Sequence, residues 1–268
     1  MSRSGAPLYT HRAETVSTDR GDGDTVVFAH GTLMDRTMFA PQLDAFSDDY
    51  RTVSVDLRAR TDRYADDYDL DDLVADVERV LDAKDIDSCV LAGMSMGGFM
   101  GLKFALDHPD RLDGLVLVDS MAKPHSPADQ ERHAATVDAL EGLPTLPEEA
   151  ARPVTHELFG ETTREERTDL VDAWVDRWTT YPGDAVKGEV YSWLDRDDLH
   201  ERVDDIDVPV LAVHGEEDAT LDIDEARDSY AEIPDLTFES IPEAGHSSNC
   251  ENPAAVNDAL ADFLDRVY

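Results

Sequence analysis

The segment Gly93-Met94-Ser95-Met96-Gly97-Gly98 lies between two apolar runs, residues 89–92 and residues 99–106. This pattern predicts a strand, a sharp turn with Ser95 at its apex, and a helix. Glycines two places before and two places after the serine remove side chains that would clash in so tight a turn. The serine oxygen would then stand above the sheet, beside a helix N-terminus that favours negative charge. The segment therefore predicts an exposed nucleophile on an α/β fold.

The partners that a serine nucleophile needs follow later in the chain. A serine requires a general base, and the base requires an acid that orients it. Asp218 follows a predicted strand at residues 208–215, and His246 follows the next predicted strand at residues 236–241. The carboxyl ends of parallel strands meet at one edge of a sheet. We therefore expect Ser95, Asp218 and His246 to meet there as a catalytic triad.

Other titratable residues near these positions leave alternatives open. Asp119 also ends a predicted strand and could orient the base, and Glu216 and Glu217 are further rivals for this role. His30 is expected to shape a loop, and His214 is expected to be structural. No cluster of cysteine and histidine residues has the spacing of a zinc site, so we expect neither a metal nor a cofactor.

Predicted strands alternate with predicted helices along most of the chain. The strands are expected at residues 25–29, 51–56, 89–92, 114–119, 208–215 and 236–241, and helices at 38–46, 69–82, 99–106 and 253–267. Residues 8–18 alternate weakly and predict one or two edge strands, and residues 19–24 predict a hairpin turn. This alternation predicts an α/β fold with a doubly wound, mostly parallel sheet.

Residues 121–204 break the alternation, because five prolines fall within residues 124–153 and the segment otherwise has a helical pattern. We interpret them as a helical cap inserted into a core formed by residues 1–120 and 205–268.

One predicted cap helix carries four large apolar residues at the spacing of a single helix face. They are Val171, Trp174, Val175 and Trp178. This face is expected to pack the cap onto the core. In the alternative interpretation Trp178, or its neighbour Trp193, forms a wall of a substrate pocket. The residues expected in that pocket are Leu33, Met121 and Trp178.

The charge of the chain is strongly negative, with 61 acidic against 23 basic residues, a formal net charge of −38 and a pI near 4.2. Disorder does not explain it, because apolar periodicity runs through the chain. A cationic partner would require one acidic block, whereas the acids are spread over most surface segments. We therefore expect adaptation to molar salt, where repulsion is screened beyond about 3 Å. The charge also argues against nucleic acid or an anionic membrane as a partner.

The 268 residues, of which 41% are hydrophobic, suffice for one large domain or a core with an insertion. No apolar run approaches the roughly 18 residues of a membrane span, and the first 24 residues have no signal-peptide pattern. The two cysteines, Cys89 and Cys250, form no C-x-x-C motif and are expected to be reduced thiols in a cytoplasmic protein. The alternative for Cys250 is a position lining the site.

Several motifs, taken in order, resemble those of the α/β-hydrolase superfamily over nearly the whole chain. They are His30-Gly31-Thr32, Asp56-Leu57-Arg58, the glycine-flanked serine turn, the segment at residues 108–112, Gly215 with Asp218, and Gly245-His246. Residues 117–122 and 245–253 look most like the enol-lactonase and small carboxylesterase branch. The resemblance implies an oxyanion hole formed by the backbone N–H groups of Thr32 and Met96. The chain departs from the family at residues 59–62, where two glycines are absent.

These observations favour a serine hydrolase that acts on a small ester or lactone through an acyl-enzyme on Ser95. Haloalkane dehalogenases and epoxide hydrolases are disfavoured, because they need a carboxylate at the position of Ser95. Two alternatives keep the triad, namely a C–C bond hydrolase and a cofactor-free haloperoxidase-like enzyme. A third alternative is a non-catalytic receptor for a small ligand, since a fold alone does not determine function. The oligomeric state does not follow from the sequence.

Overall fold

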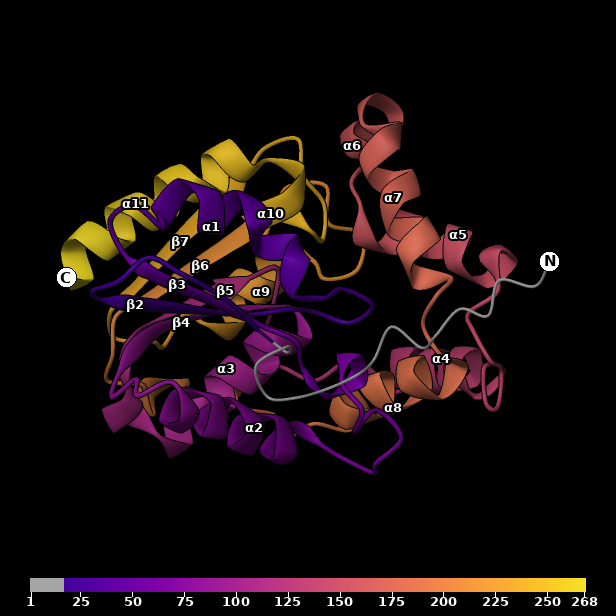
Figure 1. Ribbon diagram of the computed structural model, residues 1–268, viewed down its shortest axis with the longest axis horizontal. Coiled ribbons are helices and arrows are strands. Elements are labelled where there is room, and N and C mark those ends of the chain that lie inside the picture. Colours follow the sequence, from indigo (N-terminus) through magenta and orange to yellow (C-terminus); the bar gives the residue numbers. More distant parts are fainter. Residues whose placement is uncertain (1–16) are drawn as a thin grey trace.

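The computed structural model describes residues 17–268, whose centre is a seven-stranded sheet (Figure 1). The strands are β1 (Ser17–Arg20), β2 (Thr25–Ala29), β3 (Arg51–Val55), β4 (Cys89–Met94), β5 (Leu112–Val118), β6 (Val210–Gly215) and β7 (Leu236–Ile241). Their order is β1-β3-β2-β4-β5-β6-β7, and every neighbouring pair except β1 and β3 is parallel. The predicted doubly wound, mostly parallel sheet is confirmed.

The edge strand β1 corrects one expectation. It pairs antiparallel with β3, so that Ser17 faces Val55 and Arg20 faces Thr52. The hairpin turn predicted at residues 19–24 is therefore wrong. Both sides of β2 are already occupied by β3 and β4, and β1 can pair only at the free edge of β3. The part of the predicted edge strands at residues 8–16 lies outside the described residues.

Helices cover both faces of the sheet. In Figure 1, α1, α10 and α11 lie on one face, and α2 and α3 lie on the other. The α-helices of the described chain are α1 (Ala40–Phe46), α2 (Leu70–Ala83), α3 (Met96–Asp107), α4 (Pro127–Asp138), α5 (Glu148–Leu158), α6 (Glu161–Glu166), α7 (Thr168–Trp178), α8 (Gly183–Leu194), α9 (Ile223–Ser229), α10 (Ser248–Glu251) and α11 (Pro253–Val267). Short 3-10 turns span Arg36–Phe39, Arg58–Arg60, Pro109–Arg111 and His200–Asp205. Within residues 17–268, no helix has the length and apolar character needed to cross a membrane.

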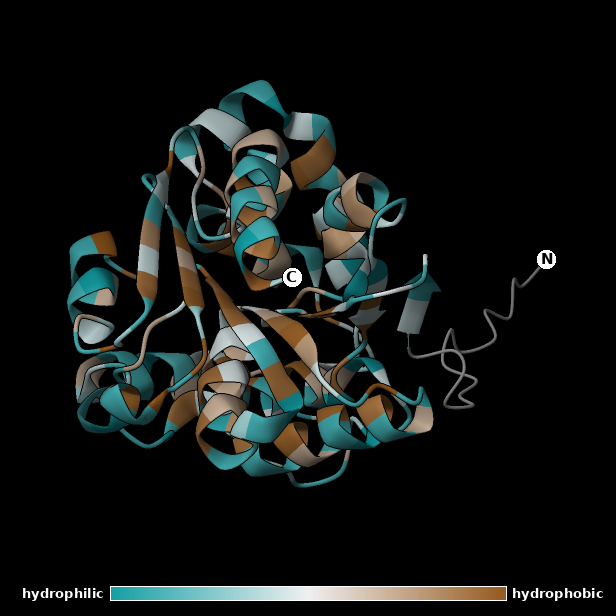
Figure 2. Cartoon of the chain, turned by 90° about the vertical axis from the view of Figure 1, so that its left-hand side faces the viewer, coloured by the Kyte–Doolittle hydropathy of each residue, from teal (hydrophilic) through white to brown (hydrophobic). Residues whose placement is uncertain are grey.

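The core lies between the sheet and the inner faces of these helices. Strands β2, β4 and β6 are buried along their whole length, which explains their continuous apolar sequences. Figure 2 shows the same division, with brown stretches on the central strands and striped teal and brown helices around them. On α2 the residues of one face are buried, and each such side chain contributes roughly 1.5–3 kcal/mol. They are Leu70, Leu73, Val74, Val77 and Leu81.

Helices α4 to α8 lie between β5 and β6 in the sequence, although these two strands pair directly in the sheet. Two contacts join the helices to loops at the carboxyl ends of strands. Trp193 of α8 donates from Nε1 to Oγ1 of Thr32, which follows β2, over 2.9 Å. Thr162 of α6 donates to Glu217, which follows β6, over 2.8 Å and 2.6 Å. The helices therefore stand at the edge of the sheet where Ser95 was expected.

Candidate active site

Ser95 occupies the single position between the end of β4 and the start of α3. Its φ of 48° and ψ of −112° lie in a strained region, which costs roughly 1–3 kcal/mol. The turn closes so tightly that a Cβ on Gly93 would lie 2.1 Å from the carbonyl oxygen of Gly97, so only glycine fits. The Ser95 N–H donates to the Val118 carbonyl over 2.9 Å. These contacts hold the serine in the conformation that the glycine pattern predicts.

The structure brings Ser95, His246 and Asp218 together. The Oγ of Ser95 is 2.9 Å from Nε2 of His246, and Nδ1 of His246 is 2.7 Å from Oδ2 of Asp218. Asp218 follows β6 and His246 follows β7, and these strands are neighbours, as the single crossover between them predicts. Since a carboxylate can only accept, the imidazole proton lies on Nδ1 and leaves Nε2 able to accept from the serine hydroxyl.

The electrostatics of this group favour a charged acid and a strong base. Burial disfavours the carboxylate of Asp218, but the charge of His246 and hydrogen bonds from two histidines hold the pKa of Asp218 well below its usual range. Burial also disfavours the imidazolium of His246, yet the charge and hydrogen bond of Asp218 raise its pKa above the ordinary histidine value. His246 is therefore a better proton acceptor than a free imidazole.

A second imidazole contacts the same carboxylate. Nε2 of His214 lies 3.0 Å from Oδ2 of Asp218 and 3.0 Å from the Leu221 carbonyl oxygen. Both partners are acceptors, so this nitrogen carries a proton and donates to them. Burial lowers the pKa of His214, but the hydrogen bond to Asp218 and the charges of Asp119 and Asp218 outweigh burial and raise it. The sequence patterns gave His214 no place beside the triad.

Asp119, the rival acid, has a different set of partners. Its two carboxylate oxygens accept the backbone N–H groups of Gly215, over 2.9 Å, and Ser248, over 2.8 Å. It thereby joins the last residue of β6 to the segment that follows β7. Asp119, His214 and Asp218 also bring metal-ligand atoms within 4.8 Å of one another. These carboxylates already accept the hydrogen bonds described above, so the cluster is explained as a hydrogen-bond network.

The expected oxyanion residues flank the serine. Met96 is the first residue of α3, so its N–H belongs to the first turn, whose amides have no acceptor within the helix. The loop that carries Thr32 packs closely against the serine turn. A Cβ added to Gly31 would lie 3.1 Å from Cβ of Ser95 and only 2.2 Å from Sδ of Met94. Thr32 and Ser95 line the same cavity.

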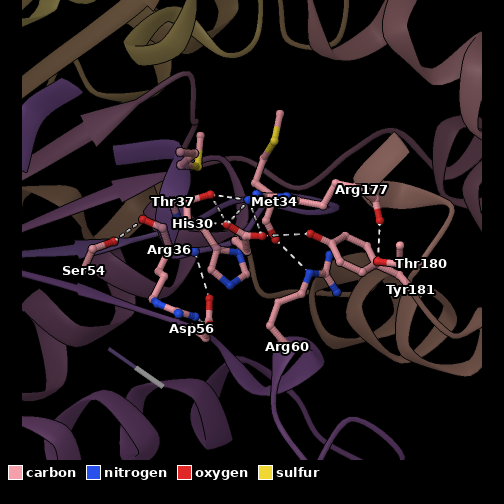
Figure 3. A network of polar contacts seen from close by, with 12 residues as sticks. His30, Met34, Arg36, Thr37, Ser54, Asp56, Arg60, Arg177, Thr180 and Tyr181 are labelled. Carbon is pink, nitrogen blue, oxygen red and sulfur yellow. Dashed lines mark hydrogen bonds and ion pairs between the residues drawn. The ribbon is translucent and has the colours of Figure 1, made fainter. Parts of the chain in front are cut away.

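A buried ion pair supports this loop from the side of α8. Glu189 accepts the N–H of Leu33 over 3.0 Å and the guanidinium of Arg60 over 2.8 Å, and both charged side chains are at most 2% exposed. Nε of Arg60 also donates to the Met34 carbonyl over 2.8 Å, and its guanidinium lies 3.9 Å above the ring centre of Tyr181. Figure 3 shows Arg60 beside Met34 and Tyr181. The loop that lacks the family's glycines therefore supplies an arginine that joins α8 to the loop at residues 31–34, where the oxyanion donor Thr32 is expected.

His30 shapes the same loop, as expected. Its Nε2 accepts the N–H of Leu57 over 2.9 Å, and its Nδ1 lies 2.9 Å from the Gly31 carbonyl oxygen. Burial, with the charge of Arg60, lowers the pKa of His30 to about 3, so the ring is neutral.

A cavity of about 370 Å³ opens above Ser95 and His246. Thr32 and the predicted Leu33 line it near the serine, and helices α4, α5 and α8 form its walls. Most of its lining is aliphatic. These residues include Val137, Leu140, Val154, Leu158, Val186 and Val190. A mostly apolar cavity lined by a few polar groups is typical of a small-molecule site.

Two of the residues expected in the pocket lie elsewhere. Trp178 is fully buried and stacks on Phe159, with ring centres 6.1 Å apart, within the buried face of α7. Met121 lines a separate hollow of about 230 Å³. Trp193, the alternative to Trp178, lines the cavity instead. Helical spacing shows which face of a helix is buried, but it does not show which neighbour covers that face.

The alternative position for Cys250 is also wrong. Both cysteines are buried free thiols, and Sγ of Cys250 donates to the Met38 carbonyl over 3.2 Å instead of lining the cavity.

Glu251 is a further residue that the sequence patterns did not single out. Its Oε1 accepts the N–H groups of Gly245 and Ser247, each over 3.0 Å, on both sides of His246. Its Oε2 accepts the N–H of Gly160 over 2.8 Å, immediately before α6. One carboxylate therefore fixes the histidine loop and joins it to the helices above. The only signal in the sequence is an acid five places after His246.

Comparison with known proteins shows the family to which the chain belongs. The sequence profile of the α/β hydrolase fold family matches residues 24–253. The chain belongs to this family. A Variovorax paradoxus protein provisionally named carbamate hydrolase RutD is 30% identical over 253 residues, covering 92% of this chain and 93% of that protein. The protein named 3-oxoadipate enol-lactonase 2 of Acinetobacter baylyi is 24% identical, with 92% and 91% covered.

Among solved structures, a thermophilic esterase from Thermogutta terrifontis superposes with a TM-score of 0.84 at 26% identity. The match covers 94% of this chain and 93% of the esterase. The esterase thus has the same fold, and the names of all three proteins describe hydrolases.

Proposed function

We propose that this member of the family is a serine hydrolase that cleaves a small ester or lactone through an acyl-enzyme on Ser95. The observation that carries the proposal is the continuous hydrogen-bonded series Ser95–His246–Asp218, whose serine and histidine line a mostly apolar cavity. The order Ser, Asp, His along the chain is the order that this fold uses for its triads. The esterase and enol-lactonase names of two relatives support the same reaction class.

Acylation begins when Oγ of Ser95 attacks the carbonyl carbon and its proton passes to Nε2 of His246. Asp218 holds the resulting imidazolium in place and stabilises its charge. The N–H groups of Thr32 and Met96 stabilise the oxyanion, and the loss of one such donor typically costs about 2.7–4 kcal/mol of barrier. Collapse of the tetrahedral intermediate breaks the bond to the leaving oxygen, which takes the proton from Nε2.

Deacylation repeats these steps with water as the nucleophile. The water gives a proton to Nε2 of His246 as its oxygen attacks the acyl carbon. Collapse of the second intermediate frees the carboxylic acid and returns the proton to Oγ of Ser95. For a lactone, the alcohol and the acid leave as one molecule.

The cavity supports small substrates. We propose that residues 121–204 act as the cap over Ser95, because α4, α5 and α8 supply most of the cavity walls. A volume of about 370 Å³ is near the lower end of the range for ligand pockets. Short acyl chains and small lactones therefore suit it better than long lipids.

A fluorophosphonate probe tests the nucleophile independently of the natural substrate. We expect one covalent adduct per chain, mapped by mass spectrometry to the peptide that contains Ser95, with none formed by the Ser95→Ala variant. Ser247 and Ser248 directly follow His246 in the sequence, and their hydroxyls serve as internal controls. An adduct on another residue, or none on active protein, would contradict the proposal.

A further inference from the structure

The segment at residues 157–163, from the end of α5 to the start of α6, packs against the loop that carries His246. A Cβ added to Gly245 would lie 2.3 Å from the nitrogen of Gly160. A Cβ added to Gly160 would lie 2.8 Å from the nitrogen of Gly245. A side chain at either position would therefore push the two backbones apart, and the residue that precedes His246 is in direct contact with this segment.

Hydrogen bonds join the same segment to the loop that carries Asp218. The hydroxyl of Thr220 donates to the Glu157 carbonyl over 2.7 Å, and its N–H donates to Oδ1 of Asp218 over 2.8 Å. The carboxylate of Glu217 accepts the N–H of Thr162 over 2.8 Å and its hydroxyl over 2.6 Å. The segment is therefore fixed to the loops of both the acid and the base of the triad.

The side chain of Glu251 bridges this segment and the histidine loop. The residue is 5% exposed, and its Oε1 accepts the N–H groups of Gly245 and Ser247, each over 3.0 Å. Its Oε2 accepts the N–H of Gly160 over 2.8 Å. Without this carboxylate, three buried N–H groups would lose their acceptor, which is unfavourable. Two of these groups lie immediately before and after His246, so their position sets the position of the imidazole.

We propose that Glu251 is a positioning residue of the hydrolysis reaction, which holds His246 in place by fixing its loop to the segment at residues 157–163. The carboxylate acts through the backbone on both sides of His246, whereas the imidazole itself bonds Ser95 and Asp218. A misplacement of about 1 Å can cost about 10² in rate, so support of this loop matters for the chemical step. The assignment rests on the proposed serine hydrolase function. It adds that this segment contributes to the chemical step as well as to the enclosure of the substrate.

Two matched alanine variants test this role. Glu251→Ala removes the acceptor for the loop around His246. Glu217→Ala also removes a carboxylate that holds the segment, but within residues 17–268 that carboxylate bonds Thr162 and not the histidine loop. On one small aryl ester we expect Glu251→Ala to lower kcat by about 10² with little change in KM. Glu217→Ala should keep kcat near the wild-type value, although both variants should melt at a lower temperature.

Glu251→Gln separates the support of the loop from the charge. It keeps an oxygen acceptor for Gly245 and Ser247, so it should recover most of the kcat that Glu251→Ala loses. The rate at which a fluorophosphonate labels Ser95 should follow the same order and does not depend on the fit of an ester. If Glu251→Ala does not fold, Glu251→Asp takes its place, because the shorter side chain cannot reach both the loop and Gly160.

Gly160→Ala tests the contribution of the segment while Glu251 is intact. The added Cβ would lie 2.8 Å from the nitrogen of Gly245 and 2.5 Å from Oε2 of Glu217, so the segment must move away from the histidine loop. We expect kcat to fall, with KM little changed. Gly188→Ala on α8 is the matched control, because the atom nearest to its Cβ would be 3.4 Å away, and it should keep the wild-type kcat.

The results separate the two proposals. A kcat of Glu251→Ala, or of its aspartate replacement, that equals that of Glu217→Ala overturns the positioning role and leaves the hydrolase intact. A loss confined to KM, an equal loss of kcat in Glu251→Gln, or an unchanged kcat in Gly160→Ala does the same. Retention of the wild-type kcat by Ser95→Ala overturns the proposed function itself.

Discussion

Asp218 accepts hydrogen bonds from two imidazoles. Its role can be separated from that of Asp119 by replacing each of the two acids with asparagine. Asp218→Asn should favour the wrong tautomer of His246 and lower kcat by about 10⁴. Asp119→Asn keeps one oxygen acceptor for Gly215 or Ser248, and its effect on kcat should be much smaller. Steady-state kinetics of both variants on one aryl ester show which of the two aspartates orients His246. If Asp119→Asn carried the larger loss, the orienting acid would lie one strand away from our assignment.

The pH dependence of kcat/KM reports on His246. The base must be neutral to accept a proton, and its pKa is raised above the ordinary histidine value of about 6.5. Activity should therefore be full above this raised pKa and be lost as the pH falls through it. An acid limb centred below the ordinary value would contradict the electrostatics described for the triad.

His214 should set the pH at which the acid limb of the kcat/KM profile falls, acting on His246 as a positioning residue. Its charge disfavours a proton on His246, and its N–H draws charge from Asp218. His214→Phe removes both effects, so the acid limb of the kcat/KM profile should move to higher pH. His214→Gln, which can still donate to Asp218, should move it less. A fall in kcat with an unshifted limb would indicate that the residue is only structural.

At the scale of elements, the Arg60–Glu189 pair joins α8 to the turn at Arg58–Arg60. Removing one partner of a buried ion pair typically costs about 3–5 kcal/mol. We expect Glu189→Ala to lower the free energy of unfolding by that amount in urea titrations. The control is Glu148→Ala, which removes an exposed partner of Arg152 and should cost at most about 1 kcal/mol. Equal losses for the two variants would show that the buried pair does not anchor the oxyanion loop.

The elements of the sheet could be predicted because they depend on local pattern. Strand β2 is a continuous apolar run, and Ser95 is marked by glycines that only a tight turn requires. Asp218 and His246 could be placed because each follows a strand, and parallel strands end at one edge. The pairing of β1, the neighbour that covers Trp178 and the contact of His214 with Asp218 could not be predicted. Each depends on which distant segment lies opposite, and a single sequence carries no local signal for that.

At the scale of the whole molecule, the cavity should limit substrate length. A pocket of about 370 Å³ walled by α4, α5 and α8 accommodates a short acyl chain but not a long one. Aryl butyrate should therefore be hydrolysed far faster than aryl palmitate, by a factor of at least about 10². Comparable kcat/KM values for the two esters would show that these helices do not close over Ser95 as proposed.

The net charge of −38 should make stability depend on salt. At about 0.1 M salt the Debye length is about 10 Å, so repulsion among the surface carboxylates favours expansion of the chain. At molar salt the range shrinks to about 3 Å and this repulsion largely vanishes. We expect the melting temperature to rise between about 0.1 M and about 2 M KCl. A melting temperature that stays flat or falls over this range would contradict the proposed adaptation to molar salt.

The role of Ser95 as the nucleophile is tested by comparing the kcat of wild type and Ser95→Ala on one small aryl ester in high salt. We expect a loss of at least about 10⁴ in kcat, because only the oxyanion hole and binding remain without the serine. Circular dichroism and the melting temperature should match the wild type, which shows that the fold is kept. A folded variant that retains a tenth of the wild-type rate would contradict the account.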